Sequence, residues 1–373
     1  MHSKTTIAVF CLLLGGLGLL NLAAPSKQFS ENENRYLKQM PKLSTPALLD
    51  GSFMKDFDAY VIDQFILRDS WVGMKTLAER SLGKSSSGGV YFARDGFLLE
   101  MFDSVGREQY AKNLAYVRDF SRYAAENHEV QANTILVPTA ALPLEDKLPA
   151  FAPEVDQAAL LRQAAQSIPG FVDVSNSLLA HHDEYIYYRT DHHWTTLGAF
   201  YAYNDWRTQT GDPAKGLDQF DQETLSDRFY GTTYTKASLY TAKPDTITAF
   251  IAKAGGTITV DYNAGALVSD SVYEPSYLSK RDKYSVFLNA NQPTVHIATG
   301  QQNGRRLLLV KDSYANTFVQ MLLDDYEEIF VIDLRYFKAS VRDYIAEKEI
   351  TDSLILYSLK GFADDANLFL LSR

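Results

Sequence analysis

The chain has 373 residues but a single cysteine, Cys11, close to the N-terminus. The rest of the sequence therefore offers no thiol for a disulfide bond within the chain or for nucleophilic catalysis. This composition fits a domain that works outside the cytoplasm, where an unpaired thiol would be exposed to oxidation.

A basic surface is not expected either, because 46 acidic residues outnumber 36 basic ones and give a net charge of −10. Nucleic-acid binding is therefore disfavoured, since phosphates are bound by clustered positive charge. Hydrophobic residues make up 46% of the chain, which is enough for a large core in one domain or two.

An uncharged run from Ile7 to about Ala24 follows Lys4. Its length approaches the ~17–25 residues that span a bilayer as a helix, so the segment is either a signal peptide or an uncleaved anchor. Cleavage after Ala24 would place Pro25 directly behind the cut, which makes a poor site. We therefore predict a single-pass membrane anchor over 1–24, with the remaining protein on the extracytoplasmic face. A cleaved segment would instead make the protein secreted.

The rest of the chain is expected to contain a lead-in and a larger domain. Apolar residues over Phe53–Leu77 have amphipathic spacing that predicts helix, and a hairpin follows it. We assign 25–105 to a helical and extended lead-in packed on the core. The larger domain covers 106–373, with an irregular, β-rich insertion, or cap, at about 212–295.

Helices and short apolar runs alternate from about Tyr110 onward. Helices are expected at 108–127, 156–167, 195–210, 314–326 and 340–349. The runs between them are "TILVPT", "GFVDVS", "RRLLLVKDS", "EEIFVID" and "SLILYSL". Short, unbroken apolar runs between helices predict an α/β fold with a buried, mostly parallel sheet.

A serine stands at the end of one predicted strand. In "LLLVKDSYANTF" the strand Leu307–Val310 leads to Ser313, ahead of residues that favour a helix. Ligands of open α/β sheets bind at this carboxyl edge, and N–H groups at a helix start can hold an oxyanion. A simple helix N-cap is the alternative, since serine is common there. The neighbouring Asp312 is expected to position the loop.

An Asp-x-His pair lies earlier in the chain, in "TDHHWT" ahead of another predicted helix. Serine is a weak nucleophile unless a base takes its proton, and the base needs a carboxylate to fix its tautomer. The offset of two residues lets Asp191 reach the Nδ1 side of His193, which leaves Nε2 free for Ser313. The three residues can therefore form a Ser-His-Asp triad, since the order of the triad members along the chain differs between folds.

These motifs together resemble the DHHW family, which is similar to the alginate O-acetyltransferase proteins and is SGNH-hydrolase-like. Further stretches that resemble the family are "FSENENRYL", "DQFILRDSW", "VYFARDGFL", "VPTAALPLEDKLP" and "IDLRYF". The likeness covers Phe29 to about Phe337. It departs from the family in "FLNANQP", where Asn289 and Ala290 stand where glycines are expected.

The resemblance implies an SGNH-like, flavodoxin-type parallel sheet flanked by helices, and a role for each triad member. Ser313 would carry the acetyl group, His193 would be the general base, and Asp191 would orient it. Four more residues are candidates for oxyanion or substrate contact: Arg335, Tyr314, Asn316 and Thr139. A structural ion pair is an equal alternative for Arg335.

His192 and Trp194 are expected to support the site rather than to react. His192 should point away from His193 if the segment is extended, because neighbouring side chains alternate. Trp194 is expected to pack beneath the site. A metal site built from these histidines and nearby aspartates is the alternative. Adjacent histidines in an extended segment seldom bind one ion, so we predict no metal and no cofactor.

The expected activity is O-acetyl transfer to a cell-surface polysaccharide through an acetyl-serine intermediate. The resemblance implies that a membrane-bound O-acyltransferase supplies the acetyl group, since acetyl-CoA is cytoplasmic. Two alternatives remain at this point: an acetylesterase with the same fold and triad, and a non-catalytic polysaccharide-binding component of a secretion complex.

Overall fold

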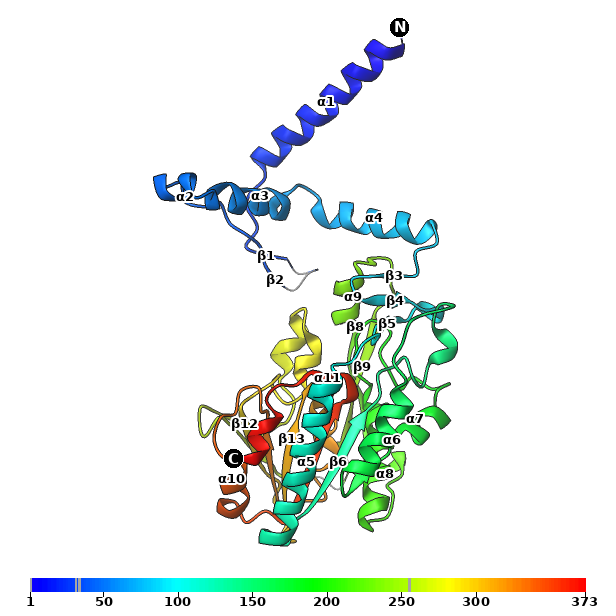
Figure 1. Ribbon diagram of the computed structural model, residues 1–373, viewed down its shortest axis with the longest axis vertical. Coiled ribbons are helices and arrows are strands. Elements are labelled where there is room, and N and C mark those ends of the chain that lie inside the picture. Colours follow the sequence, from blue (N-terminus) through cyan, green and yellow to red (C-terminus); the bar gives the residue numbers. More distant parts are fainter. Residues whose placement is uncertain (1, 31, 33–34, 254–255) are drawn as a thin grey trace. The chain divides into compact units, whose positions relative to one another are not determined.

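The computed structural model describes residues 2–30, 32, 35–253 and 256–373 (Figure 1). The chain divides into two compact units. One comprises Met1–Gly88 with Thr235–Thr241, and the other comprises Gly89–Tyr234 with Ala242–Arg373.

The first unit begins with α1 (His2–Ala23), whose stretch Lys4–Ala23 is long and apolar enough to cross a membrane by length and composition. The remaining described elements of this unit are short or amphipathic: β1 (Phe29–Ser30), β2 (Arg35–Tyr36), α2 (Thr45–Leu49), α3 (Ser52–Gln64), α4 (Arg68–Ser81) and β3 (Ser86–Ser87). The predicted amphipathic helix is therefore two helices. They separate at Leu67, which has a φ of +55°.

Two of the family-like stretches lie in this unit and bind each other. The Arg35 guanidinium donates to both carboxylate oxygens of Asp63, at 2.9 and 2.6 Å. Asn32 Nδ2 donates to Asp69 at 2.6 Å. These contacts join "FSENENRYL" to "DQFILRDSW"; Glu31, Glu33 and Asn34 of the first stretch lie outside the described residues.

The second unit is built on a large mixed sheet, which confirms the predicted α/β class. In order across the sheet its described strands are β11 (Leu267–Ser269), β10 (Thr259–Tyr262), β12 (Thr294–Ala298), β14 (Glu328–Ile332), β13 (Arg306–Lys311), β15 (Asp352–Ser358), β6 (Gln131–Val137) and β7 (Phe171–Val172). The run from β14 to β7 is parallel. The order of the parallel strands differs from that of flavodoxin because β15, the last strand in the chain, lies between β6 and β13.

Helices cover both faces of this sheet, so the unit has three layers. One face packs against α5 (Arg107–His128), which crosses the sheet in Figure 1, and against α6 (Gln157–Ser167), α10 (Val341–Glu347) and α11 (Leu359–Asp364). The other face packs against α7 (Ser175–Ala180) and α8 (Thr196–Thr210). The helices predicted at 108–127, 156–167 and 195–210 are confirmed.

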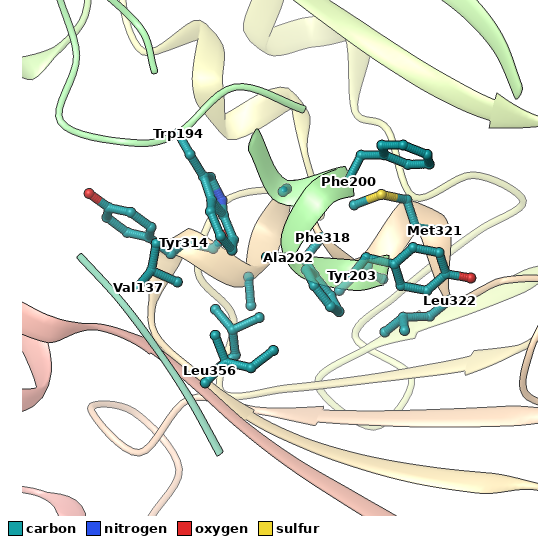
Figure 2. Packing of buried hydrophobic residues seen from close by; sticks show 14 of the residues in the cluster. Val137, Trp194, Phe200, Ala202, Tyr203, Tyr314, Phe318, Met321, Leu322 and Leu356 are labelled. Atoms are coloured by element: carbon teal, nitrogen blue, oxygen red, sulfur yellow. The ribbon is translucent and has the colours of Figure 1, made fainter. Parts of the chain in front are cut away.

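Large aromatic side chains fill the layer between α8 and the sheet (Figure 2). Phe200 and Tyr203 of α8, with Trp194 just ahead of it, pack near Tyr314 and Phe318. This core lies directly beneath the strand that leads to Ser313. It therefore fixes the backbone of the candidate site from one side.

The predicted insertion is rich in β structure, but part of it belongs to the main sheet. β8 (Phe220–Phe229) and β9 (Asp245–Ala252) pair with each other as an antiparallel ribbon. In contrast, β10, β11 and β12 extend the parallel strands in antiparallel orientation. They continue the sheet at the β14 edge, where main-chain groups would otherwise be unpaired.

The helix predicted over 314–326 does not form. The chain there makes two short 3₁₀ turns, Ser313–Asn316 and Val319–Met321. All nine residues from Tyr314 to Leu322 are buried, so this segment has no exposed face to offer as a surface helix. The expected support of an oxyanion by a long helix dipole after Ser313 is therefore wrong.

Candidate active site

Ser313 lies at the carboxyl edge of the sheet, immediately after β13, as the first residue of a 3₁₀ turn. Asp312 holds this turn in place. Its Oδ1 accepts the N–H of Tyr314 at 2.9 Å, and its Oδ2 accepts the N–H and hydroxyl of Ser358 at 2.9 and 2.7 Å. Because Ser358 ends β15, the turn that begins at Ser313 is tied to the neighbouring strand. Asp312 thus occupies the positioning place expected from the sequence.

Asp191, His193 and Ser313 form a continuous hydrogen-bonded relay. His193 Nδ1 lies 2.5 Å from Asp191 Oδ1, and its Nε2 lies 2.8 Å from Ser313 Oγ. The carboxylate can only accept, so Nδ1 carries the proton and Nε2 accepts from the serine hydroxyl. This is the arrangement that a serine nucleophile and its general base need.

The bend that carries Asp191 is fixed by a second, buried carboxylate. Asp245, at the start of β9, accepts the backbone N–H groups of Arg189 and Thr190 at 2.9 and 2.8 Å. It also accepts the Thr190 hydroxyl at 2.5 Å and the Tyr185 hydroxyl. The insertion therefore shapes the loop that carries Asp191 and His193, although it contributes no member of the relay.

Asp191 itself receives two further hydrogen bonds from Thr232. The N–H and hydroxyl of Thr232 donate to Asp191 Oδ2 at 2.7 and 3.1 Å, which leaves Oδ1 for His193. Gly231, the residue before Thr232, must be glycine for steric reasons. A Cβ on Gly231 would lie 2.2 Å from both Cβ and Oδ2 of Asp191.

Burial and charge set the protonation of the relay. Burial alone would raise the pKa of Asp191, but His192, His193 and the donated hydrogen bonds hold it well below its ordinary value. Burial and the neighbouring His192 lower the pKa of His193 to about 4, against the raising effect of Asp191. His193 is therefore neutral at pH 7, which is the state that a general base needs.

Tyr284 is a site residue that the sequence analysis missed. Its ring stacks on the His193 imidazole, with centroids 3.9 Å apart and planes at 10°, and its hydroxyl donates to the Ser313 carbonyl at 3.0 Å. It lies in the 3₁₀ turn Lys283–Val286, within the irregular insertion. The flanking sequence "DKYSVFLNANQP" carries no periodic pattern that would have placed it beside His193.

His192 does not point away from His193, contrary to the expectation. The two rings are 3.8 Å apart, because residues 189–193 form a bend rather than an extended strand. His192 Nδ1 lies 2.6 Å from Thr232 Oγ1 and 3.6 Å from Asp191 Oδ1. Trp194 is fully buried below, and its Nε1–H donates to the Tyr314 carbonyl at 2.9 Å.

Among the described residues, Asp191, His192 and His193 are the candidates for a metal site. Ligand atoms of Asp191, His192 and His193 lie within 4.8 Å of one another. However, both ring nitrogens of His193 already face Asp191 and Ser313. A metal ion bound through His193 would have to displace one of these contacts.

A cavity of about 550 Å³ opens beside Ser313. Of the four predicted contact residues, Thr139, Tyr314 and Arg335 line it. Arg335 also forms the ion pair that was its alternative, with its guanidinium bound to Asp333 at 2.9 and 2.5 Å. Other polar residues of the lining were not foreseen: Glu100, Ser358, Lys360, Asp364, Asp365 and Asn367.

Asn316 does not line the cavity; its Oδ1 accepts from the buried Lys311 ammonium at 2.6 Å. Lys311 also donates to Asn291 Oδ1 at 3.0 Å, which ties the loop at "FLNANQP" to the end of β13, just before Ser313. Asn289 and Ala290 have φ values of +50° and +65°. This loop therefore keeps the left-handed conformation that glycine favours, although the glycines are absent.

Comparison with known proteins finds a family model that matches part of this chain. The DHHW protein family model matches residues 166–332, which include the whole relay. A crystal structure of a DHHW family protein from Eubacterium siraeum is 28% identical, with a TM-score of 0.66 over 77% of this chain and 96% of that one. The predicted resemblance to the DHHW family is thus confirmed.

Two other solved structures are similar to this chain at lower identity, and the first of them shares the fold. PatB1 from Bacillus cereus, solved with a sulfonyl adduct, is 19% identical over 75% of this chain and 98% of its own, with a TM-score of 0.63. The O-acetyltransferase domain of AlgJ from Pseudomonas putida is 15% identical over 74% of this chain and 93% of its own, with a TM-score of 0.47. Among curated proteins, the sequence search found no match.

Proposed function

We propose that this protein is an O-acetyltransferase that passes an acetyl group through Ser313 to a cell-surface polysaccharide. The observation that carries the proposal is the relay from Asp191 through His193 to Ser313, with Ser313 opening on a polar cavity. A serine held 2.8 Å from a neutral imidazole is poised for attack on a carbonyl carbon.

In the first step Ser313 Oγ bonds to the acetyl carbon of the donor while its proton moves to His193 Nε2. Asp191 stabilises the imidazolium that forms. The carbonyl oxygen becomes an oxyanion, which the Ser313 backbone N–H can bind. The oxyanion then re-forms the carbonyl, the bond to the leaving group breaks, and that group takes the proton from His193. Acetyl-serine remains.

In the second step a sugar hydroxyl enters the cavity and loses its proton to His193 as its oxygen attacks the acetyl carbon. The bond from that carbon to Ser313 Oγ breaks, and His193 returns the proton to the serine. The cavity lining, with its carboxylates, Lys360 and Arg335, offers donors and acceptors for a polyhydroxylated acceptor. The products are an acetylated sugar and the regenerated relay.

We place this reaction on the extracytoplasmic face of the bacterial cell membrane, with α1 as a single-pass anchor. A membrane-bound O-acyltransferase would bring the acetyl group across, since acetyl-CoA stays in the cytoplasm. The length and apolar character of Lys4–Ala23 support the anchor, and the near absence of cysteine supports the location.

The test uses the purified full-length chain, an activated acetyl ester and a panel of glycans. The proposal expects acetylated glycan to accumulate at the expense of free acetate when a suitable glycan is added. Release of acetate at an unchanged rate in the presence of every glycan would favour an acetylesterase with the same relay. Failure to cleave the ester at all would favour a non-catalytic polysaccharide-binding protein.

A further inference from the structure

The helix α4 buries a face of small and polar residues, which is unusual for an amphipathic helix. Its buried residues are the small Gly73 and the polar Thr76. A Cβ on Gly73 would lie 2.6 Å from the Tyr240 ring, so this face packs closely against the segment Thr235–Thr241 of the same unit. An ordinary surface helix buries its apolar stripe and exposes its polar one, and α4 does the reverse.

The exposed face of α4 carries a continuous apolar stripe, which comprises Leu67, Trp71, Met74, Ala78 and Leu82. The spacing of four, three, four and four residues keeps these side chains on one side of the helix. The four large ones are 44–88% exposed. A row of this kind marks a surface that another apolar phase covers.

Hydrogen bonds fix the start of this stripe to the end of α1. The Asn21 side-chain carbonyl, in the last turn of α1, accepts the N–H of Ile66 at 2.9 Å. Gln64 exchanges two hydrogen bonds of 2.8 Å with the backbone of Lys27. The stripe begins at Leu67, the next residue after Ile66. If α1 spans a bilayer, α4 therefore starts where the chain leaves it.

The charges around the stripe also match a lipid surface. Residues 67–84 contain four basic side chains and two acidic ones, whereas the whole chain has a net charge of −10. A local excess of Lys and Arg beside an apolar face with tryptophan is typical of helices that lie in the membrane interface.

We infer that the apolar stripe of α4 lies in the surface of the bilayer that α1 crosses, so that α4 is an interfacial helix. The inference rests on the proposed anchor but does not depend on the proposed chemistry. Two helices then hold the first unit on the membrane, one across it and one along it. The paired stretches at Arg35–Asp63 and Asn32–Asp69 brace the junction between them.

The chain contains its own reporter for this contact. It has three tryptophans, of which Trp194 and Trp206 are buried, and only Trp71 lies on an exposed face. The fluorescence of Trp71 is obtained by subtracting the emission spectrum of Trp71→Phe from that of the wild-type protein. Full-length protein is reconstituted into vesicles of phosphatidylcholine and phosphatidylglycerol, with plain or brominated acyl chains. Flotation after an alkaline wash checks the anchor.

The inference predicts that brominated lipid removes most of the Trp71 emission, and that water-soluble acrylamide barely quenches it. The variant Leu67→Ser with Met74→Ser should reverse both results while the protein still floats. Leu179→Ser, an exposed leucine on α7 of the second unit, is the matched control and should leave them unchanged.

Three outcomes would overturn the inference. Trp71 open to acrylamide and unaffected by brominated lipid would place the stripe in water. Trp71 shielded from both quenchers would mean that protein covers it. If the wild-type protein were lost from the floating fraction, α1 would not be a membrane anchor, and the inference of an interfacial helix would fail with it. None of these readings requires acetyl transfer, so the chemistry can fail or stand independently.

Discussion

Tyr284 lies flat against the imidazole of His193 while its hydroxyl donates to the carbonyl of Ser313. One side chain thus contacts both the proposed base and the proposed nucleophile. The ring blocks one face of the imidazole, and its own burial raises the pKa of its hydroxyl well above the ordinary value. Tyr284 therefore stays neutral and acts through position rather than by proton transfer.

Substitutions of Tyr284 should separate its two contacts. Tyr284→Phe keeps the stacked ring and loses one hydrogen bond of about 1 kcal/mol, so kcat/KM should fall about fivefold. Tyr284→Leu removes the flat ring as well. It should cost clearly more and move the midpoint of the pH profile upward, because water then reaches His193. Equal activity and an unshifted profile in both variants would show that the stack does not matter.

Gly231 should tolerate no side chain, because an added Cβ would displace Asp191. We expect Gly231→Ala to lower kcat by about 100-fold with a smaller change in KM, since the misplaced carboxylate no longer holds the imidazole. Gly106→Ala is the control, because its nearest neighbour would be 3.9 Å away. Circular dichroism of both variants checks the fold. An active, folded Gly231→Ala would contradict the packing described around Asp191.

Activity should persist to a lower pH than a general base with the ordinary pKa of histidine would allow. His193 is the base only when neutral, and burial lowers its pKa to about 4. kcat/KM should therefore be flat above that pH and fall as pH drops through about 4. Initial rates with an activated acetyl ester measure this, with circular dichroism to exclude acid unfolding. A midpoint near the ordinary value of about 6.5 would contradict the buried, neutral base.

The sequence predicted the relay because each member sits at a marked position. Ser313 follows an apolar strand, and Asp191 and His193 precede a capped helix, so the positions of these strand and helix ends indicated that the three residues lie at one edge of the sheet. Tyr284 and Thr232 could not be foreseen, since both come from the insertion, where no hydrophobic period fixes the fold. The prediction for His192 was wrong because side chains alternate in direction only along an extended chain. This segment is bent, and hydrogen bonds to Asp245 at the start of β9 hold the bend.

The strands themselves were predictable from unbroken apolar runs, but their order was not. β15 lies between β6 and β13 through contacts far apart in the chain, which local patterns do not encode. The failed helix after Ser313 has a similar origin. Residues 314–322 are buried on every side, and the sequence pattern does not distinguish a buried turn from a buried helix.

The two adjacent histidines should differ sharply in function. His193→Ala should lose as much activity as Ser313→Ala, because base and nucleophile act as one unit. Asp191→Asn should lose somewhat less, since the imidazole remains in a poorly held tautomer. His192→Ala should keep measurable turnover. If His192→Ala were as inactive as His193→Ala, and zinc restored a chelated enzyme, the metal alternative would replace the relay.

The most direct measurement is intact-protein mass spectrometry after brief exposure to an activated acetyl ester. The account predicts one added acetyl group per chain, located by peptide mapping on Ser313, lost on addition of an acceptor glycan, and absent in Ser313→Ala. A sulfonyl fluoride should block the same residue. An acetyl group on another residue, or full transferase activity in folded Ser313→Ala, would contradict it.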